Sequence, residues 1–233
     1  MNVSIRKITA ILEKQLKDTL KNKEVLIQFL MFPVMALIME NTVSIDGMPE
    51  GFFVKLFSSM YIGMAPLTAM SAIVAEEKEK NTLRVLLMSD VKAGEYLLGV
   101  GSYVWAACML GSCVLAVVGG FRGKELAVFL GVMCIGIVIS LLAGAAVGIW
   151  SRTQMAATSV TVPVMMVFSF LPMIGMFNEG IKKLADMTYS GQIYGWMQQI
   201  SSLELGVKNL AVVGCNLLVA VICFAAAYRK SMY

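Results

Sequence analysis

Six long stretches of the sequence contain no Asp, Glu, Lys or Arg, and they occupy residues 25–39, 56–75, 96–121, 126–151, 153–178 and 209–228. A helix of about 20 apolar residues crosses the hydrocarbon core of a bilayer. Backbone groups in lipid must be paired within their own segment, which favours helices. We therefore predict an all-α integral membrane protein, a single transmembrane domain over residues 1–233. Its six transmembrane helices are expected near residues 25–41, 56–75, 96–120, 126–150, 154–177 and 208–228.

The composition excludes several classes of protein. Hydrophobic residues make up 58% of the chain and charged residues 15%, too little polar surface for a soluble domain of 233 residues. The net charge is +4, without a basic block interleaved with aromatics, so we expect no nucleic-acid partner. There is no histidine, and the five cysteines lie in apolar stretches without CxxC spacing. We therefore expect no metal site and no catalytic residue in this chain.

The distribution of basic residues predicts the orientation in the membrane. With the N-terminus inside, the inner segments carry 13 Lys and Arg residues and the outer segments carry 6. Segments on the cytoplasmic side are the more basic ones. We predict a multi-pass protein of the cell membrane with both termini in the cytoplasm and residues 76–95 in the first cytoplasmic loop.

Two further segments are too polar to span. Residues 4–23 combine basic residues with an apolar stripe, which predicts an interfacial helix along the inner surface; a plain solvated helix is the alternative. The stripe consists of Ile5, Ile8, Leu12, Leu16 and Leu20. Residues 178–207 predict one or two short helices at the outer surface, which could re-enter the bilayer. Their aromatic side chains suit the membrane interface, and these are Tyr189, Tyr194 and Trp196.

Small residues and prolines within the spans have two interpretations each. Gly136, Ser140, Gly144 and Gly148 recur every four residues, which allows close helix packing either within the chain or across a dimer seam. Prolines bend helices, and bent helices line a pathway or are passive features of shape. The prolines inside spans are Pro33, Pro66, Pro163 and Pro172.

The first cytoplasmic loop contains the densest charge in the chain. Glu76, Glu77, Lys78, Glu79 and Lys80 are followed by Asn81 and Thr82, either of which can cap a new helix. Leu83, Leu86 and Leu87 then fall on one helical face. This pattern predicts a short amphipathic helix that docks a soluble partner, and the alternative is an ordinary charged loop.

Residues 76–99 resemble the segment after the second helix in the membrane subunits of type-2 ABC exporters. The residues that match the family pattern are Glu77, Glu79, Thr82, Leu83, Leu86, Leu87, Ser89, Leu98 and Gly99. Asn81, Asp90 and Val100 stand where the family has Gly, Pro and Lys. Asn81 tolerates the left-handed conformation that glycine would supply. The wider resemblance, in helix number and order, covers nearly the whole chain.

The resemblance implies a coupling helix at residues 81–88 that seats in a groove of a separate cytoplasmic ABC ATPase. The residues expected at this contact are Glu76, Glu77, Glu79, Asn81, Thr82, Leu83, Arg84, Leu86, Leu87 and Met88. The chain has no GxxxxGK[ST] phosphate loop, so ATP and Mg²⁺ would bind the partner and no cofactor would bind here. The family pairs two permease copies, identical or closely related, through their first and fifth helices. Candidates for the pathway or this seam are Pro33, Pro66, Pro163 and Phe168.

The expected function is therefore that of a permease subunit without enzymatic activity. It would export a lipophilic or amphipathic substrate, such as a drug, a peptide or a lipid-like molecule, powered by the separate ATPase. Two alternatives remain: an ATP-independent channel or carrier, and a non-transporting immunity or scaffold protein in the membrane. The charge-free spans disfavour an ion-coupled carrier, which usually needs an ionisable group inside the membrane.

Overall fold

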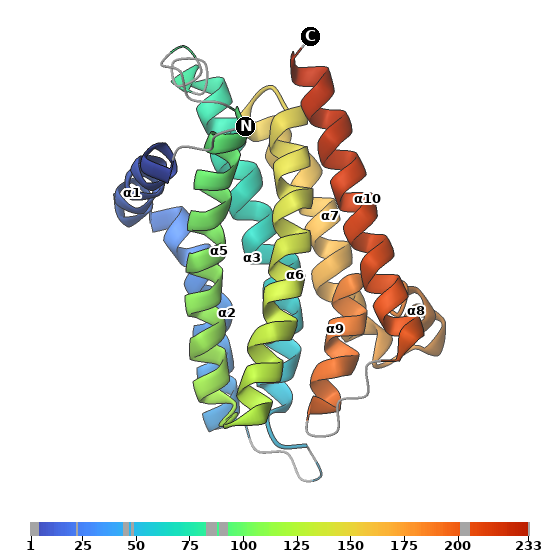
Figure 1. Cartoon of the computed structure of the whole chain (residues 1–233). Helices are drawn as coiled ribbons and strands as arrows, with labels where there is room; N and C mark the ends of the chain where they lie inside the picture. Colours follow the sequence, from blue (N-terminus) through green and yellow to red (C-terminus); the bar gives the residue numbers. More distant parts are fainter. Residues whose placement is uncertain are drawn as a thin grey trace.

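A computed structural model describes residues 5–21, 23–43, 47, 49–82, 88, 93–200 and 206–232, and within these ranges the chain forms helices and no strand. The helices form an upright bundle with α1 lying across its side (Figure 1). Their bounds are α1 (Ile5–Lys21), α2 (Lys23–Thr42), α3 (Phe52–Glu79), α5 (Ala93–Val118), α6 (Lys124–Trp150), α7 (Gln154–Gly175), α8 (Glu179–Ala185), α9 (Tyr189–Gln198) and α10 (Val207–Met232).

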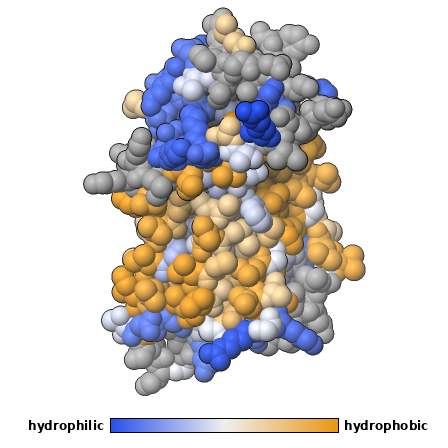
Figure 2. Space-filling model, turned by 60° about the vertical axis from the view of Figure 1, so that its left-hand side comes forward, coloured by the Kyte–Doolittle hydropathy of each residue, from blue (hydrophilic) through white to orange (hydrophobic). Residues whose placement is uncertain are grey.

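Five of the described helices, α3, α5, α6, α7 and α10, are long and apolar enough to cross a membrane. Helix α2 contributes a shorter apolar stretch, Leu26–Thr42. The surface matches this reading, because a hydrophobic belt separates two hydrophilic ends (Figure 2). The prediction of an all-α, multi-pass membrane protein is confirmed, while the sixth span stays a prediction.

Helix α3 lies at the centre of the bundle, in contact with α2, α5, α6, α7 and α9. Small residues on α6 allow the closest of these approaches. A Cβ atom added to Gly144 would lie 2.4 Å from the carbonyl oxygen of Leu67, and one added to Gly148 would lie 2.9 Å from that of Ser71. The small-residue stripe of α6 therefore packs against α3 within the chain, and is not free to form a dimer seam.

Buried hydroxyl groups join the same helices. The Ser71 and Thr161 hydroxyls lie 2.8 Å apart between α3 and α7. Ser169 on α7 donates to the carbonyl of Met60 on α3 over 3.1 Å. Ser140 on α6 likewise donates to the carbonyl of Ile62 on α3. A hydroxyl buried in an apolar interior is costly unless it is paired, so these bonds specify how α3, α6 and α7 meet.

Helix α9 folds back into the bundle and packs against α3, α6, α7 and α10. Tyr189 is 1% exposed and Trp196 is 3% exposed, so both rings are enclosed by the protein, and their place at the level of the membrane interface stays a prediction. Tyr189 can be buried because its hydroxyl lies 2.6 Å from that of Ser140 on α6. That partner is 49 residues away, and aromatic content alone does not reveal it.

The two ends of the bundle are distinct in Figure 1. The last turns of α3 and α10 lie at the upper end, together with the beginning of α5. At the lower end, the carboxylate of Glu40 on α2 accepts hydrogen bonds from the backbone N–H groups of Gly51, Phe53 and Val54. A carboxylate at a helix N-terminus satisfies otherwise unpaired donors. This contact fixes how α2 joins α3.

Candidate functional site

The last turn of α3, residues 76–80, projects beyond the apolar segment at the upper end of the bundle; we call it the α3 terminus. The helix ends where Asn81 adopts a φ of 57°. The N–H of Asn81 donates to the carbonyl of Lys78 over 3.2 Å. A residue in the left-handed region is a common end for a helix, and Asn tolerates that region better than most side chains. The expected conformational role of Asn81 is confirmed.

Glu77 joins the α3 terminus to α1. Its side chain is nearly buried, and Oε1 accepts hydrogen bonds from Lys14 Nζ at 2.5 Å and from Gln15 Nε2 at 2.6 Å. Gln15 is itself 4% exposed. A buried carboxylate is costly unless it is paired and hydrogen-bonded, and α1 supplies both kinds of partner.

The next two residues reach two other helices. Lys78 Nζ donates to the carbonyl of Ile149, in the last turn of α6, over 2.5 Å. Glu79 Oε2 accepts from the backbone N–H of Gln154, the first residue of α7, over 2.7 Å. Helix C-termini favour cations and helix N-termini favour anions, so each charge meets the matching end of a neighbouring helix. Three consecutive residues of the α3 terminus thus contact α1, α6 and α7.

Helix α1 docks on the bundle through a second contact. A Cβ atom on Gly99 of α5 would lie 2.8 Å from Ile11 Cγ2, so the glycine makes room for Ile11. Lys7 Nζ lies 4.0 Å from Glu95, a carboxylate of α5 whose side chain is 3% exposed. Leu16, on the predicted apolar stripe, is instead 47% exposed. The face of α1 that contains Ile11 and Gln15 contacts protein, and the stripe beside it is left partly open.

The remaining coupling residues are less constrained. Glu76 pairs with Lys80 along the helix over 2.5 Å, and this carboxylate raises the pKa of the Lys80 ammonium above its ordinary value. Thr82 and Met88 are helical, and Met88 is 81% exposed. Four of the predicted contact residues lie outside the described part of the chain, namely Leu83, Arg84, Leu86 and Leu87.

The candidates for a pathway or dimer seam lie in different surroundings. Pro33 on α2 and Pro66 on α3 are buried within the chain, whereas Pro163 on α7 is exposed. The Phe168 ring packs against the Tyr189 ring, with centroids 4.8 Å apart. The structure does not gather these four residues into one site.

Sequence reasoning missed Lys14 and Gln15 as partners of Glu77 in the α3 terminus. It also missed Gly99 as the place where α5 receives Ile11 of α1. The only signal was indirect: Ile11 and Gln15 share a helical face four residues apart, and Gly99 lies within the segment that resembles the exporter family.

These features define a multi-pass helical membrane protein in which a charged helix terminus links several helices at one end of the bundle. The family model described as "ABC-2 family transporter protein" matches residues 2–229, and the chain belongs to this family. Proteins of the family are membrane components of ABC transporters, and its permeases work with a cytoplasmic ATPase. A comparison with curated proteins gave no match.

Proposed function

We propose that the chain is the permease subunit of an ATP-driven exporter that moves a lipophilic or amphipathic substrate out of the cytoplasm. A separate ABC ATPase would bind ATP and Mg²⁺ and hydrolyse the nucleotide. The observation that carries the proposal is the α3 terminus, where Glu77, Lys78 and Glu79 each contact a different helix immediately before the predicted coupling helix.

The α3 terminus suits the transfer of motion from a docked ATPase. A displacement of residues 81–88 pulls directly on the end of α3. Glu77 then moves α1, while Lys78 and Glu79 move the adjoining ends of α6 and α7. Because α3 also packs along α6 and α7 in the belt, the same displacement reaches the membrane-spanning part. Packed helices and hydrogen-bond networks are the usual carriers of such coupling.

A second permease copy would cover apolar faces of α2 and α7. Both helices pack against α3 on one side and expose large apolar side chains on the other. These exposed residues include Ile27, Leu30, Val34, Leu37 and Ile38 on α2, and Met155, Val162, Met166 and Val167 on α7. Close packing against a second copy would use Pro163, whereas Pro33 and Phe168 would support the seam from inside each chain.

The decisive experiment replaces the adjacent leucine pair of the predicted coupling helix, Leu86→Asp with Leu87→Asp. A buried leucine contributes about 1.5–3 kcal/mol, and roughly 1.4 kcal/mol corresponds to a tenfold change in affinity. We expect the ATPase to co-purify at least about tenfold less, with loss of substrate-stimulated ATP hydrolysis in reconstituted membranes. The matched control is Met187→Asp with Val207→Asp, two exposed apolar side chains remote from the α3 terminus.

Wild-type levels of ATPase binding and ATP hydrolysis in the leucine variant would exclude residues 81–88 as the coupling element. Substrate transport by the purified chain without an ATPase would instead support the channel or carrier alternative.

A further inference from the structure

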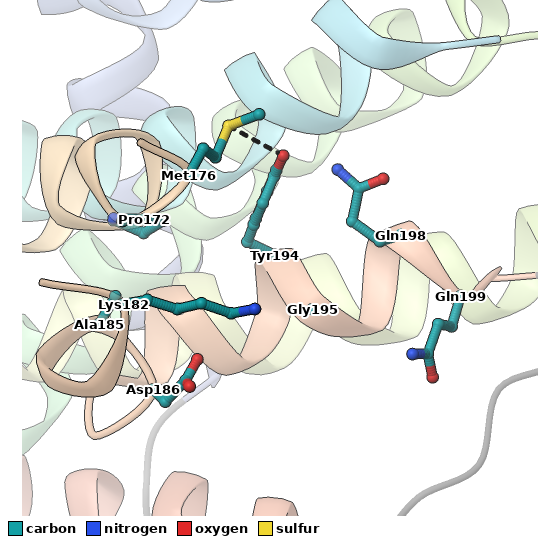
Figure 3. Close-up of a pocket in the computed structure, with 11 residues that line it drawn as sticks. Pro172, Met176, Lys182, Ala185, Asp186, Tyr194, Gly195, Gln198 and Gln199 are labelled. Carbon is teal, nitrogen blue, oxygen red and sulfur yellow. Dashed lines mark hydrogen bonds between the residues drawn. The ribbon is translucent and has the colours of Figure 1, made fainter. Parts of the chain in front are cut away.

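A cavity of about 380 Å³, with an apolar and a polar side, opens between the end of α7 and helices α8 and α9, far from the α3 terminus. Pro172, Met176 and Ala185 form its apolar wall (Figure 3). Charged, amide and hydroxyl groups line the other side, supplied by Lys182, Asp186, Tyr194, Gln198 and Gln199. Cavities of this size accommodate small molecules or the polar part of larger ones.

The cavity is framed by close backbone contacts. A Cβ atom on Gly191 would lie 2.0 Å from the carbonyl oxygen of Ala185, and one on Gly175 would lie 3.1 Å from the Cα of Lys182. The side-chain amide of Gln192 also donates to the carbonyl of Asp186 over 2.5 Å. Substitution of the two glycines would force α7, α8 and α9 apart, so the shape of the cavity depends on them.

The polar groups of the cavity are weakly engaged within the protein. Among the described residues, neither Lys182 nor Asp186 forms an ion pair. The Tyr194 hydroxyl donates to the sulfur of Met176 over 3.2 Å, and a thioether is a weak acceptor. Burial raises the pKa of Tyr194 above its ordinary value, which keeps the hydroxyl a donor. A cation, an anion and a hydroxyl donor are thus available to a ligand.

The position along α7 places the cavity near a membrane surface. Helix α7 begins at Gln154, beside the α3 terminus, and its 22 residues end at Gly175 in the cavity wall. At about 1.5 Å per residue the helix is roughly 33 Å long, close to the thickness of the hydrocarbon core. Apolar side chains are exposed nearby, with Phe177 at 81% and Met187 at 68%.

We propose that this cavity binds the headgroup of a phospholipid in which a primary ammonium is joined through two carbons to the phosphate. The Lys182 ammonium and the Tyr194 hydroxyl bind the phosphate, and the Asp186 carboxylate binds the lipid ammonium. Lys182 and Asp186 lie one helical turn apart, about 5–6 Å between Cβ atoms, which suits the short separation of the two lipid charges. The acyl chains lie along the exposed apolar side chains that include Phe177.

The choice of headgroup follows from the hydrogen-bonding groups. A primary ammonium donates hydrogen bonds, and the Asp186 carboxylate in the cavity lining is an acceptor of opposite charge. A quaternary ammonium has no donor and is usually held by several aromatic rings, of which the cavity wall has one, Tyr194. An anionic headgroup without an ammonium leaves Asp186 close to the phosphate, which repels it.

The first test compares lipids on the purified full-length protein in detergent. Phosphatidylethanolamine and phosphatidylglycerol with identical acyl chains are titrated, and binding is read by native mass spectrometry and by the shift in Tm. We expect preferential binding of phosphatidylethanolamine, weakened roughly tenfold by Lys182→Gln with Asp186→Asn, because charge-assisted hydrogen bonds are lost. The control is Lys183→Gln with Glu179→Gln, the neighbouring charges of α8 that do not line the cavity.

A second variant tests occupancy of the cavity. Gly195 lines the cavity and a Cβ atom added to it meets nothing within 4 Å, so we expect Gly195→Leu to place its side chain in the cavity. We expect an unchanged or higher Tm without lipid, since Leu favours helices more than Gly, and no preference for phosphatidylethanolamine. Equal binding of both lipids by the wild type, or an unchanged preference in both variants, would overturn the proposal. So would equally strong binding of free phosphoethanolamine, which would indicate a site for a soluble zwitterion. None of these readings needs an ATPase or a transported substrate.

Discussion

The side-chain amide of Gln15 on α1 donates a 2.6 Å hydrogen bond to the carboxylate of Glu77 at the end of α3, 62 residues further along the chain. Both side chains are buried. An N-terminal helix that merely floated on the membrane surface would have no need of this contact. Helix α1 is therefore attached to the α3 terminus, and this attachment can be tested directly.

Replacement Glu77→Ala should release α1. It leaves Gln15 and Lys14 without their acceptor, and hydrogen bonds to charged groups contribute about 1.5–3 kcal/mol. We expect hydrogen exchange of the α1 amides to accelerate at least about tenfold, measured by mass spectrometry. Glu13→Ala is the control, because Glu13 is exposed and pairs with Lys17 on the same helix. Equal protection of α1 in wild type and Glu77→Ala would contradict this role of Glu77.

The contact between Ile11 and Gly99 predicts a compensating pair of substitutions. Gly99→Ala places a methyl group within 3 Å of Ile11 and should loosen α1, although Ala favours helices more than Gly. Adding Ile11→Ala should recover part of the loss, with an interaction energy of about 0.5–3 kcal/mol in a double-mutant cycle of α1 exchange. Gly101→Ala, which meets open space on the same helix, should leave α1 protected. Strictly additive effects of the two substitutions would show that Ile11 and Gly99 do not act together.

A methyl group on Gly144 should separate α6 from α3. It would lie 2.4 Å from the Leu67 carbonyl oxygen, which is backbone and cannot swing aside. Overpacking of this kind costs about 1–3 kcal/mol, so we expect Gly144→Ala to lower the Tm in detergent. Gly131→Ala on the same helix meets nothing within 4 Å and should leave Tm unchanged or raise it slightly. Identical melting of the two variants would show that the close approach of α3 and α6 is not needed.

The predicted orientation can be tested with single cysteines in a cysteine-free variant. Ser4→Cys and Ser231→Cys should be protected from a membrane-impermeant thiol reagent in intact cells and should react after lysis. Lys183→Cys, exposed on α8 at the end of the bundle remote from the α3 terminus, should react in both conditions. Labelling of either terminal cysteine in intact cells would contradict the predicted cytoplasmic location of that terminus.

Much of the fold could be predicted from residue chemistry along the chain. Charge-free windows of bilayer length indicate helices wherever they occur, because lipid offers the backbone no other partner. The end of α3 was also readable, since Asn81 is one of the few residues that enter the left-handed region at low cost. These features depend on local sequence alone.

The attachment of α1 could not be predicted in the same way. Periodicity identified Ile8, Leu12 and Leu16 as the apolar stripe. Leu12 does pack against the core, but the buried contacts of α1 come from Ile11 and Gln15 on the adjoining face, and Leu16 is exposed. Gln15 is polar, and its burial depends on Glu77, which accepts a hydrogen bond from its side-chain amide. Pairing across such a distance in sequence depends on how helices assemble, which hydrophobic periodicity does not encode.

The order of charges in the α3 terminus determines the rotational orientation of α3 about its helix axis. Successive helical residues point about 100° apart, so Glu77, Lys78 and Glu79 face three directions. Glu77 contacts a lysine of α1, and Lys78 contacts a carbonyl at the end of α6. Glu79 contacts an N–H at the start of α7. Turning α3 by one residue in either direction would bring two of these three charges to a group of like polarity. The three contacts therefore oppose rotation of α3 about its own axis. A force on the adjoining loop can tilt or shift α3 more easily than it can rotate the helix.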